Sequence, residues 1–277
     1  MKSSGPILTA HLFPVIEQRL IELLMQLTEG EWELQTISPR WKVKDVAAHL
    51  LDTQLRKLSL ARDGYSSQSP VIRSDADLGA FINRLNDEGV SMYRRLSPPV
   101  LISLMEVASN ESAEYHQSLD PFAPAAFSVS WAGEDESLNW FDTARELTER
   151  WHHQQQIRLA VNRPGIMIRE LYYPVLDCFM RALPHAYREI EASPETLLAF
   201  EVSGDCGGVW QLLRASDSWT IVTDAPQTPA SRVIVPQEIA WRIFTKGISR
   251  EQATQQIRID GDRELGSHLL NVIAIVG

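Results

Sequence analysis

Cysteine is nearly absent from this 277-residue sequence, which contains only Cys178 and Cys206. Two cysteines are too few for a disulfide framework or for a cysteine-rich zinc site. The sequence also lacks any apolar run near the ~20 residues that a membrane-spanning helix needs. Its N-terminal segment has neither the long apolar core nor the small-residue cleavage site of a signal peptide. These absences predict a cytoplasmic protein with no membrane partner.

Positive charge is also scarce. The chain has 26 Lys and Arg against 36 Asp and Glu, a net charge of -10, and no basic block of five or more residues. We therefore expect no nucleic-acid partner and no binding to an anionic membrane surface. Hydrophobic residues make up 44% of the chain, which is too many for a disordered protein. The length favours two domains.

The first 165 residues have the pattern of an antiparallel four-helix bundle. Apolar residues recur at spacings of three and four, as in Leu20, Leu23, Leu24 and Leu27, which is typical of one buried helix face. Pro and Gly clusters separate the periodic segments. We expect helices over about 12–27, 42–61, 77–96, 100–119 and 140–161, enough for a bundle in residues 1–165.

The pattern changes in the second half. A connecting helix over about 169–191 and a linker are expected in residues 166–194. Short segments rich in β-forming residues then follow at 197–202, 209–215, 219–223 and 232–235. Helix-like segments come next, at 237–244, 250–256 and 263–274. Strands followed by helices predict a small α+β domain over residues 195–277, so the fold class is multidomain, α and α+β.

His49 lies on the second predicted helix, among apolar residues. Asp52, Thr53 and Arg56 follow it one and two turns along the same face. A helix face directed at an apolar core should not carry such a polar track. The track therefore indicates either a site inside the bundle or a face exposed to solvent.

Glu149 and His153 lie four residues apart on the last predicted helix of the bundle, and so project from one face. A carboxylate and an imidazole at this spacing can bind one metal ion. Glu146 and His152 compete for the same role from neighbouring faces. The alternative is an exposed helix whose charged residues form ordinary ion pairs.

His49, Glu149 and His153 together would form a ligand set of two histidines and one glutamate. Such a set typically binds Zn²⁺ and leaves a fourth position open for catalysis, although Ni²⁺, Fe²⁺ or Mn²⁺ also bind mixed nitrogen and oxygen ligands. Other chemistries find less support. Nucleotide-binding and serine-hydrolase motifs are missing from the sequence, Cys206 lies in a predicted turn, and Cys178 fits helix packing.

The segment "PRWKVKDVAAHLLD" and the later ExxxH helix resemble the DinB-like, or YfiT-like, metal-binding four-helix bundles. Over nearly its whole length the chain resembles the mycothiol-dependent maleylpyruvate isomerase family. The C-terminal part, from "VIVPQEIAW" onward, resembles that family's small domain, which is similar to sterol carrier protein-2.

The resemblance assigns the metal ligands to His49, Glu149 and His153. The family often has an Asp three residues after the second histidine, where this chain has Gln156. Thr53, Arg56, Gln156 and Arg84 are candidates for contacts to the substrate or behind the ligands. No catalytic residue beyond the metal ligands is assigned.

The resemblance implies an enzyme with a small-molecule substrate and a low-molecular-weight thiol as cosubstrate. The thiol would bind the metal as thiolate and add to the double bond of maleylpyruvate. Rotation and elimination would then give the trans isomer, fumarylpyruvate. The alternatives are a thiol S-transferase of the same superfamily and a non-enzymatic ligand-binding or stress protein. A monomer and a homodimer are both compatible with the sequence.

Overall fold

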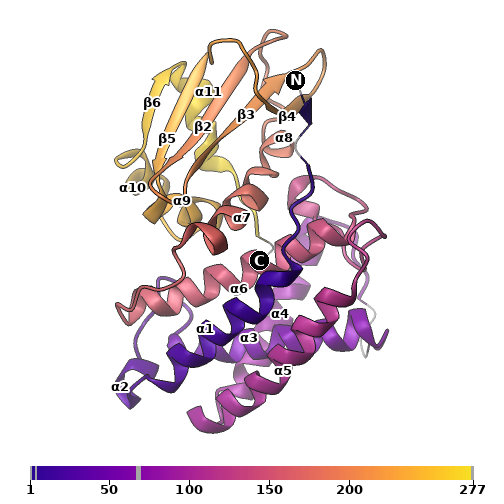
Figure 1. The fold of residues 1–277 in the computed structure, drawn as a ribbon, viewed down its shortest axis with the longest axis vertical. Coiled ribbons are helices and arrows are strands. Elements are labelled where there is room, and N and C mark those ends of the chain that lie inside the picture. Colours follow the sequence, from indigo (N-terminus) through magenta and orange to yellow (C-terminus); the bar gives the residue numbers. More distant parts are fainter. Residues whose placement is uncertain (1, 4, 67–69, 276–277) are drawn as a thin grey trace.

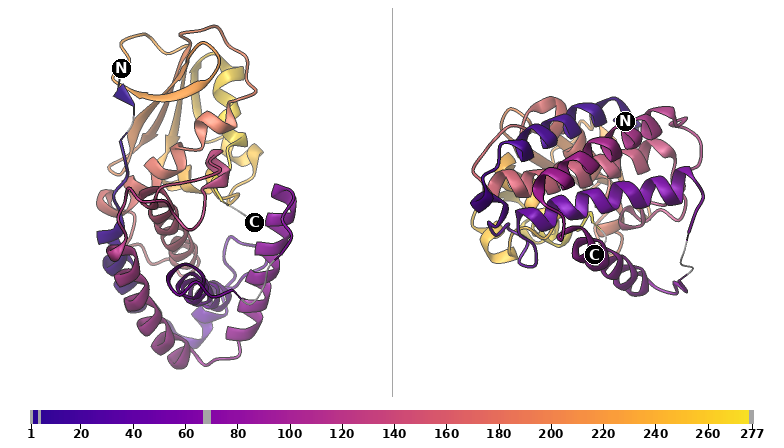
Figure 2. Two further views of the ribbon diagram at one scale, coloured as in Figure 1. Left: turned by 90° about the vertical axis from the view of Figure 1, so that its right-hand side faces the viewer. Right: turned by 90° about the horizontal axis from the view of Figure 1, so that it is seen from below.

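The N-terminal half of the chain is helical. The computed structural model describes residues 2–3, 5–66 and 70–275, and Figure 1 shows the helices below a sheet domain. The long helices are α1 (Phe13–Met25), α3 (Val43–Lys57), α4 (Asp75–Tyr93), α5 (Pro98–Ser118) and α6 (Asn139–Ala160). Helices α1, α3, α5 and α6 pack on one another as a bundle, and α4 packs against α3 from the side (Figure 2).

The bundle helices form where the apolar periodicity predicts them. In α1 the apolar stripe, which includes Ile16, Leu20 and Leu24, is buried. Helix α3 begins after Lys42, whose backbone N–H donates to the Asp45 carboxylate at 3.1 Å, a contact that stabilises a helix N-terminus. A short helix α2 (Glu29–Trp32) occupies the connection between α1 and α3.

The connecting segment contains two helices where the sequence predicts one. Helix α7 (Arg169–Met180) ends, and the short α8 (Leu183–Ala186) begins with Pro184 in its first turn. Proline lacks the N–H that would continue the earlier helix, which accounts for the break. Helix α7 packs against both α6 and α9 (Gln237–Phe244), so it joins the bundle to the second half.

The second half is built on one mixed sheet. Its strands run in the order β1-β4-β3-β2-β5-β6, and β2 and β5 are parallel while the other neighbours are antiparallel. The bounds are β2 (Leu197–Ser203), β3 (Gly208–Arg214), β4 (Trp219–Thr223), β5 (Ser231–Pro236) and β6 (Arg258–Gly261). Helices α9, α10 (Arg250–Thr254) and α11 (Arg263–Ser267) accompany it. The predicted combination of a helical bundle and an α+β domain is confirmed.

The first strand comes from the N-terminal end of the chain. β1 (Lys2–Ser3) pairs antiparallel with β4, with Lys2 opposite Thr223 and Ser3 opposite Val222. In Figure 1 the indigo N-terminal segment runs from α1 up to the edge of the sheet. This pairing could not be predicted from the sequence, because two residues carry no periodicity.

The largest hydrophobic core runs from the bundle into the sheet domain. It contains Trp151 of α6, Tyr172 of α7 and Trp241 of α9. The Trp151 and Tyr172 rings stack with centroids 4.2 Å apart, and Trp151 meets Trp241 edge-on at 6.0 Å. The two halves are therefore packed together. Within the described ranges no helix is both long enough and apolar enough to span a bilayer.

Candidate metal centre

His49 faces the interior of the bundle. Its side chain lies on α3 and only 4% of the residue is exposed. The indole of Trp41 covers its ring, with centroids 4.5 Å apart. The polar track on α3 is therefore not a solvent-exposed face, because Asp52 is also buried and Thr53 and Arg56 are partly buried.

His153 lies beside His49, and Glu149 lies beside His153. Glu149 Oε2 is 3.5 Å from His153 Nε2, one helical turn along α6. The His49 and His153 rings meet edge to face, with centroids 4.5 Å apart. The structure thus brings the three residues that the sequence singled out together from α3 and α6, two helices that pack on each other.

His152 lies in the same cluster. Ligand atoms of Glu149, His152 and His153 all fall within 4.8 Å of one another, and the two imidazole rings have centroids 3.9 Å apart. His152 Nδ1 donates to the Thr148 carbonyl at 2.9 Å, so its Nε2 carries the free lone pair. Among the described residues this group of mutually close ligand atoms contains His152 and does not contain His49, whose ring contacts the ring of His153.

One buried nitrogen in the cluster lacks a hydrogen-bond partner. His49 Nδ1 is buried and has no hydrogen-bond partner within the described parts of the chain. A buried polar atom left in this state is destabilising. A divalent cation beside the imidazole would satisfy it, and imidazole nitrogen with carboxylate oxygen is a donor set that Zn²⁺ accepts. The residues present therefore fit a metal ion.

The environment keeps His49, His152 and Glu149 in the protonation states that metals require. Burial lowers the pKa of His49 well below its usual value and lowers the pKa of His152 to about 4. Burial alone would raise the pKa of Glu149, but the neighbouring His152 and His153 more than offset it, and the net pKa is lowered. Neutral imidazoles and an ionised carboxylate are the ligand forms of these groups.

Of two other predicted residues, both in the described part of the chain, Gln156 contacts the cluster and Thr53 does not. Gln156 Oε1 accepts a hydrogen bond from His153 Nδ1 at 3.0 Å. The Thr53 hydroxyl donates to the Leu50 carbonyl at 3.0 Å and accepts from Arg150 Nη1 at 2.8 Å. Gln156 orients a predicted ligand, and Thr53 is engaged by the protein interior.

The two arginines differ. Arg56 Nε lies 2.7 Å from Asp52 Oδ2, its Nη2 donates to Asn86 at 2.6 Å, and its charge helps to lower the pKa of His49. Arg84 has a 56% exposed side chain and lies 3.9 Å from Glu88 on its own helix. Arg56 therefore lies close enough to His49 to affect its pKa, whereas Arg84 lies on the exposed surface of α4.

Two features near the cluster were missed. Trp41 lies in the motif that carried the resemblance, yet nothing in the sequence shows that it covers His49. Lys57, Asp142 and Glu146 form buried ion pairs, with Lys57 Nζ 2.6 Å from Asp142 Oδ2 and 3.4 Å from Glu146 Oε1. In sequence these charges resemble an exposed helix face, and only the fold shows that they are paired inside.

Neither cysteine is suited to act as a nucleophile. Cys178 and Cys206 are free and buried, and burial raises the pKa of both thiols. Because the thiolate is the reactive form, the chain has no activated thiol at these positions.

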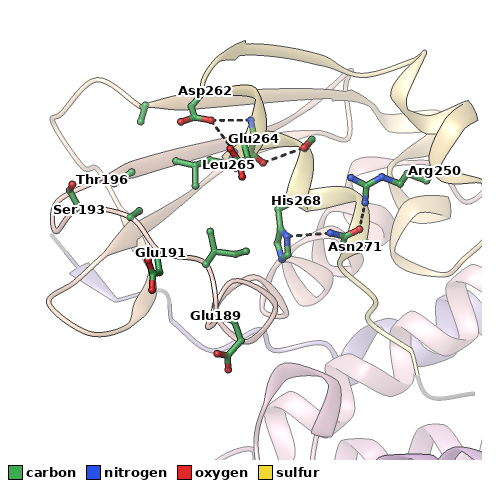
Figure 3. Close-up of a pocket in the computed structure, with 14 residues that line it drawn as sticks. Glu189, Glu191, Ser193, Thr196, Arg250, Asp262, Glu264, Leu265, His268 and Asn271 are labelled. Carbon is green, nitrogen blue, oxygen red and sulfur yellow. Dashed lines mark hydrogen bonds between the residues drawn. The ribbon is translucent and has the colours of Figure 1, made fainter.

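A cavity of about 660 Å³ lies in the sheet domain (Figure 3), and none of its lining residues belongs to the His/Glu cluster. Four carboxylates line it, those of Glu189, Glu191, Asp262 and Glu264. An apolar ligand prefers a mostly apolar pocket with few polar groups. The lining therefore gives no support to binding of an apolar ligand at this place.

Comparison with known proteins identifies the family. The family model described as the mycothiol maleylpyruvate isomerase N-terminal domain matches residues 13–158. Crystal structures of the mycothiol-dependent maleylpyruvate isomerase and of a mutant of it have a similar fold. Their TM-scores are 0.51 and 0.54, at 10% identity and 91% coverage of both chains.

Two further comparisons add little. A sterol carrier protein domain of Helicoverpa armigera matches 36% of this chain and 80% of its own, with 14% identity and a TM-score of 0.26, which supports no argument. No curated protein matches the sequence. Since the family model spans more than half of the 277 residues, the chain belongs to the mycothiol maleylpyruvate isomerase N-terminal domain family.

Proposed function

We propose that this protein is a metal-dependent enzyme that uses a low-molecular-weight thiol, with His49, Glu149 and His153 as the metal ligands. The observation that carries the proposal is the meeting of these side chains between α3 and α6, where the buried His49 Nδ1 has no other described partner. The reaction is cis–trans isomerisation of an activated double bond, as the names of the family and of the similar crystal structures suggest.

A bound divalent ion would lower the pKa of a thiol beside it, so that the thiol is available as thiolate. The chain's own residues prepare the place. Gln156 holds His153 so that its Nε2 faces Glu149, and Trp41 excludes water from one side of His49. Addition of the thiolate to the double bond leaves a single bond that rotates, and loss of the same thiolate restores the double bond as the trans isomer.

The absence of an activated thiol in the chain agrees with an external thiol. Both cysteines are buried with raised pKa values. Zn²⁺ is the metal we propose, because two imidazoles and one carboxylate with an open position form a common catalytic zinc set. Mycothiol is the proposed thiol, on the strength of the family description.

The test combines metal analysis with an assay. Freshly purified protein should contain stoichiometric divalent metal, and should convert maleylpyruvate only when mycothiol is added. Metal without conversion would refute the isomerase, and transfer of the thiol to an electrophile would then identify an S-transferase. Protein that neither contains nor binds a divalent metal would refute the metal centre itself.

A further inference from the structure

A closed circuit of polar contacts crosses the bundle beside the His/Glu cluster. Arg150 of α6 donates from Nη1 to the Thr53 hydroxyl at 2.8 Å and to the Leu50 carbonyl at 3.2 Å, both on α3. The Nε of the same guanidinium lies 3.4 Å from Glu17 Oε1, on α1. Arg150 thus contacts two other helices from a position in which only 2% of the residue is exposed.

The circuit returns to α3 through α5. The Ser109 hydroxyl of α5 donates to Glu17 Oε2 at 3.0 Å, and Gln54 Nε2 of α3 donates to Ser109 Oγ at 3.1 Å. All four bundle helices are therefore linked. We call the residues of this circuit the Arg150 ring; they are Glu17, Thr53, Gln54, Ser109 and Arg150.

The ring is adjacent in sequence to every proposed ligand. On α3, Leu50 directly follows His49, and Thr53 lies one turn further along. On α6, Arg150 directly follows Glu149 and precedes His153 by three residues. A contact from Arg150 to Leu50 and Thr53 therefore joins the turn of α3 that bears His49 to the turn of α6 that bears Glu149 and His153.

Hydrogen bonds and ion pairs restrict the movement of one helix against another more than apolar packing does. Two helices joined only by apolar side chains can shift along or about their axes with a change of rotamers. Nη1 of Arg150 donates to a hydroxyl and a carbonyl of α3, while its Nε forms an ion pair with the Glu17 carboxylate; neither Nε nor Nη2 has a hydrogen-bond partner among the described residues. A shift of α3 against α6 would break the hydrogen bonds of Nη1 and leave this buried charge with poorer partners still. The Arg150 ring therefore fixes the height and rotation of α3 against α6.

We propose that the Arg150 ring is a positioning device that sets the distance between His49 and the Glu149–His153 pair, and so the affinity and geometry of the metal site. The proposal rests on the proposed ligand set. Thr53 and Arg150 act through the ligands and touch neither the substrate nor the reacting atoms.

The experiment compares two serines of α5. Ser109→Ala removes a ring member. Ser112→Ala removes a hydroxyl that is equally buried but has no hydrogen-bond partner among the described residues. Metal-free protein is titrated with Co²⁺ alone, and the visible absorption bands and the affinity are recorded. Ser109→Ala should bind Co²⁺ more weakly by up to about tenfold, with altered bands, because it removes the hydrogen bond to Glu17 and so loosens Arg150; direct partners of metal ligands contribute about tenfold or more. Ser112→Ala should match the wild type.

Thr53→Val gives a second ring variant of nearly unchanged size, and should shift the Co²⁺ bands in the same direction as Ser109→Ala. Unchanged affinity and bands in both ring variants would overturn the proposal. If wild-type protein binds no Co²⁺, the proposed metal centre fails instead.

The free energy of unfolding of the metal-free Thr53→Val, Ser109→Ala and double variants then decides whether the ring residues act together. Non-additive stabilities are expected, and additive ones would refute it.

Discussion

His153 Nδ1 donates a hydrogen bond to Gln156 Oε1 at 3.0 Å, one turn away on α6. Since the ring proton is at Nδ1, the lone pair of His153 is at Nε2, which lies 3.5 Å from Glu149 Oε2. A hydrogen bond of this kind fixes the tautomer and the orientation of a metal-binding imidazole. The amide of Gln156 thus stands where the resembling family often has a carboxylate.

Gln156→Leu should weaken metal binding, because it keeps the size of the side chain and removes the acceptor for His153. We expect a loss of affinity of about 10- to 100-fold, measured by competition between the protein and a chromophoric chelator for Zn²⁺. Gln155→Leu is the matched control, since Gln155 is also buried on α6 and its Oε1 has no described partner. Equal affinities for the two variants would contradict the role of Gln156.

The ligand set can be tested by single histidine substitutions. His49→Ala should lose most bound metal, whereas His152→Ala should retain it, because His49 is a member of the proposed ligand set and its buried Nδ1 has no hydrogen-bond partner among the described residues. Metal content after gel filtration gives the measurement, and exposed His11 provides the control variant His11→Ala. The reverse result, with metal lost only from His152→Ala, would make His152 the third ligand in place of His49.

Gly89→Ala should destabilise the contact between α4 and α3. A Cβ at this position would lie 2.2 Å from the Asp52 Cγ and 2.4–2.5 Å from its oxygens, and Asp52 is paired with Arg56. Crowding of this kind typically costs about 1–3 kcal/mol, which denaturant unfolding measures. Gly79→Ala on the same helix meets open space and should be stabilising by up to about 1 kcal/mol. Two variants of equal stability would contradict the close approach.

Buried His116 should make the protein less stable in acid. Burial, with smaller contributions from Lys57 and Arg150, lowers its pKa to about 3 against the opposing effect of Glu146 and Asp142. The unfolded chain therefore takes up a proton near the ordinary histidine pKa of 6.5, at a pH where the folded chain does not bind it. Stability contributed by neutral His116 is complete above that value and is lost as the pH falls toward about 3.

His116→Phe should flatten this dependence. The ring of His116 stacks on Phe13 with centroids 4.2 Å apart, so phenylalanine can retain the packing. Below pH 6.5 the slope of unfolding free energy against pH should decrease by up to about 1.4 kcal/mol per pH unit, as measured by urea unfolding. His11→Phe should keep the wild-type slope. Parallel curves for His116→Phe and wild type would show that His116 carries no such effect.

The meeting of Glu149 and His153 could be predicted because helical spacing alone places them one turn apart. The position of His49 opposite them could be suggested but not decided. The polar residues near it on α3 are compatible with a solvent-exposed face as well as with a buried one. The residues that pair with the buried charges come from distant segments of the sequence. Lys57 pairs with Asp142 across 85 positions. Arg150 is buried for the same reason, and its i,i+4 spacing from Glu146 reads as an ordinary surface pair.

Most of the sheet could be predicted from its composition. The expected strand at 219–223 matches β4, and the expected helix at 237–244 matches α9. β1 and β6 were missed because one is two residues long and the other, Arg258–Gly261, has a single apolar residue. Their pairing depends on the neighbouring strands, which present backbone groups to them, and not on any pattern of their own.

One turn of α6 contributes both to the packing against the sheet domain, through Trp151, and to the His/Glu cluster. The Trp151 indole stacks on Tyr172 toward the sheet domain, while its neighbours His152 and His153 belong to the His/Glu cluster. A fragment of residues 1–165 would lack Tyr172 and Trp241 and would expose this indole to water. We therefore expect the bundle to be unstable when it is produced without the second half.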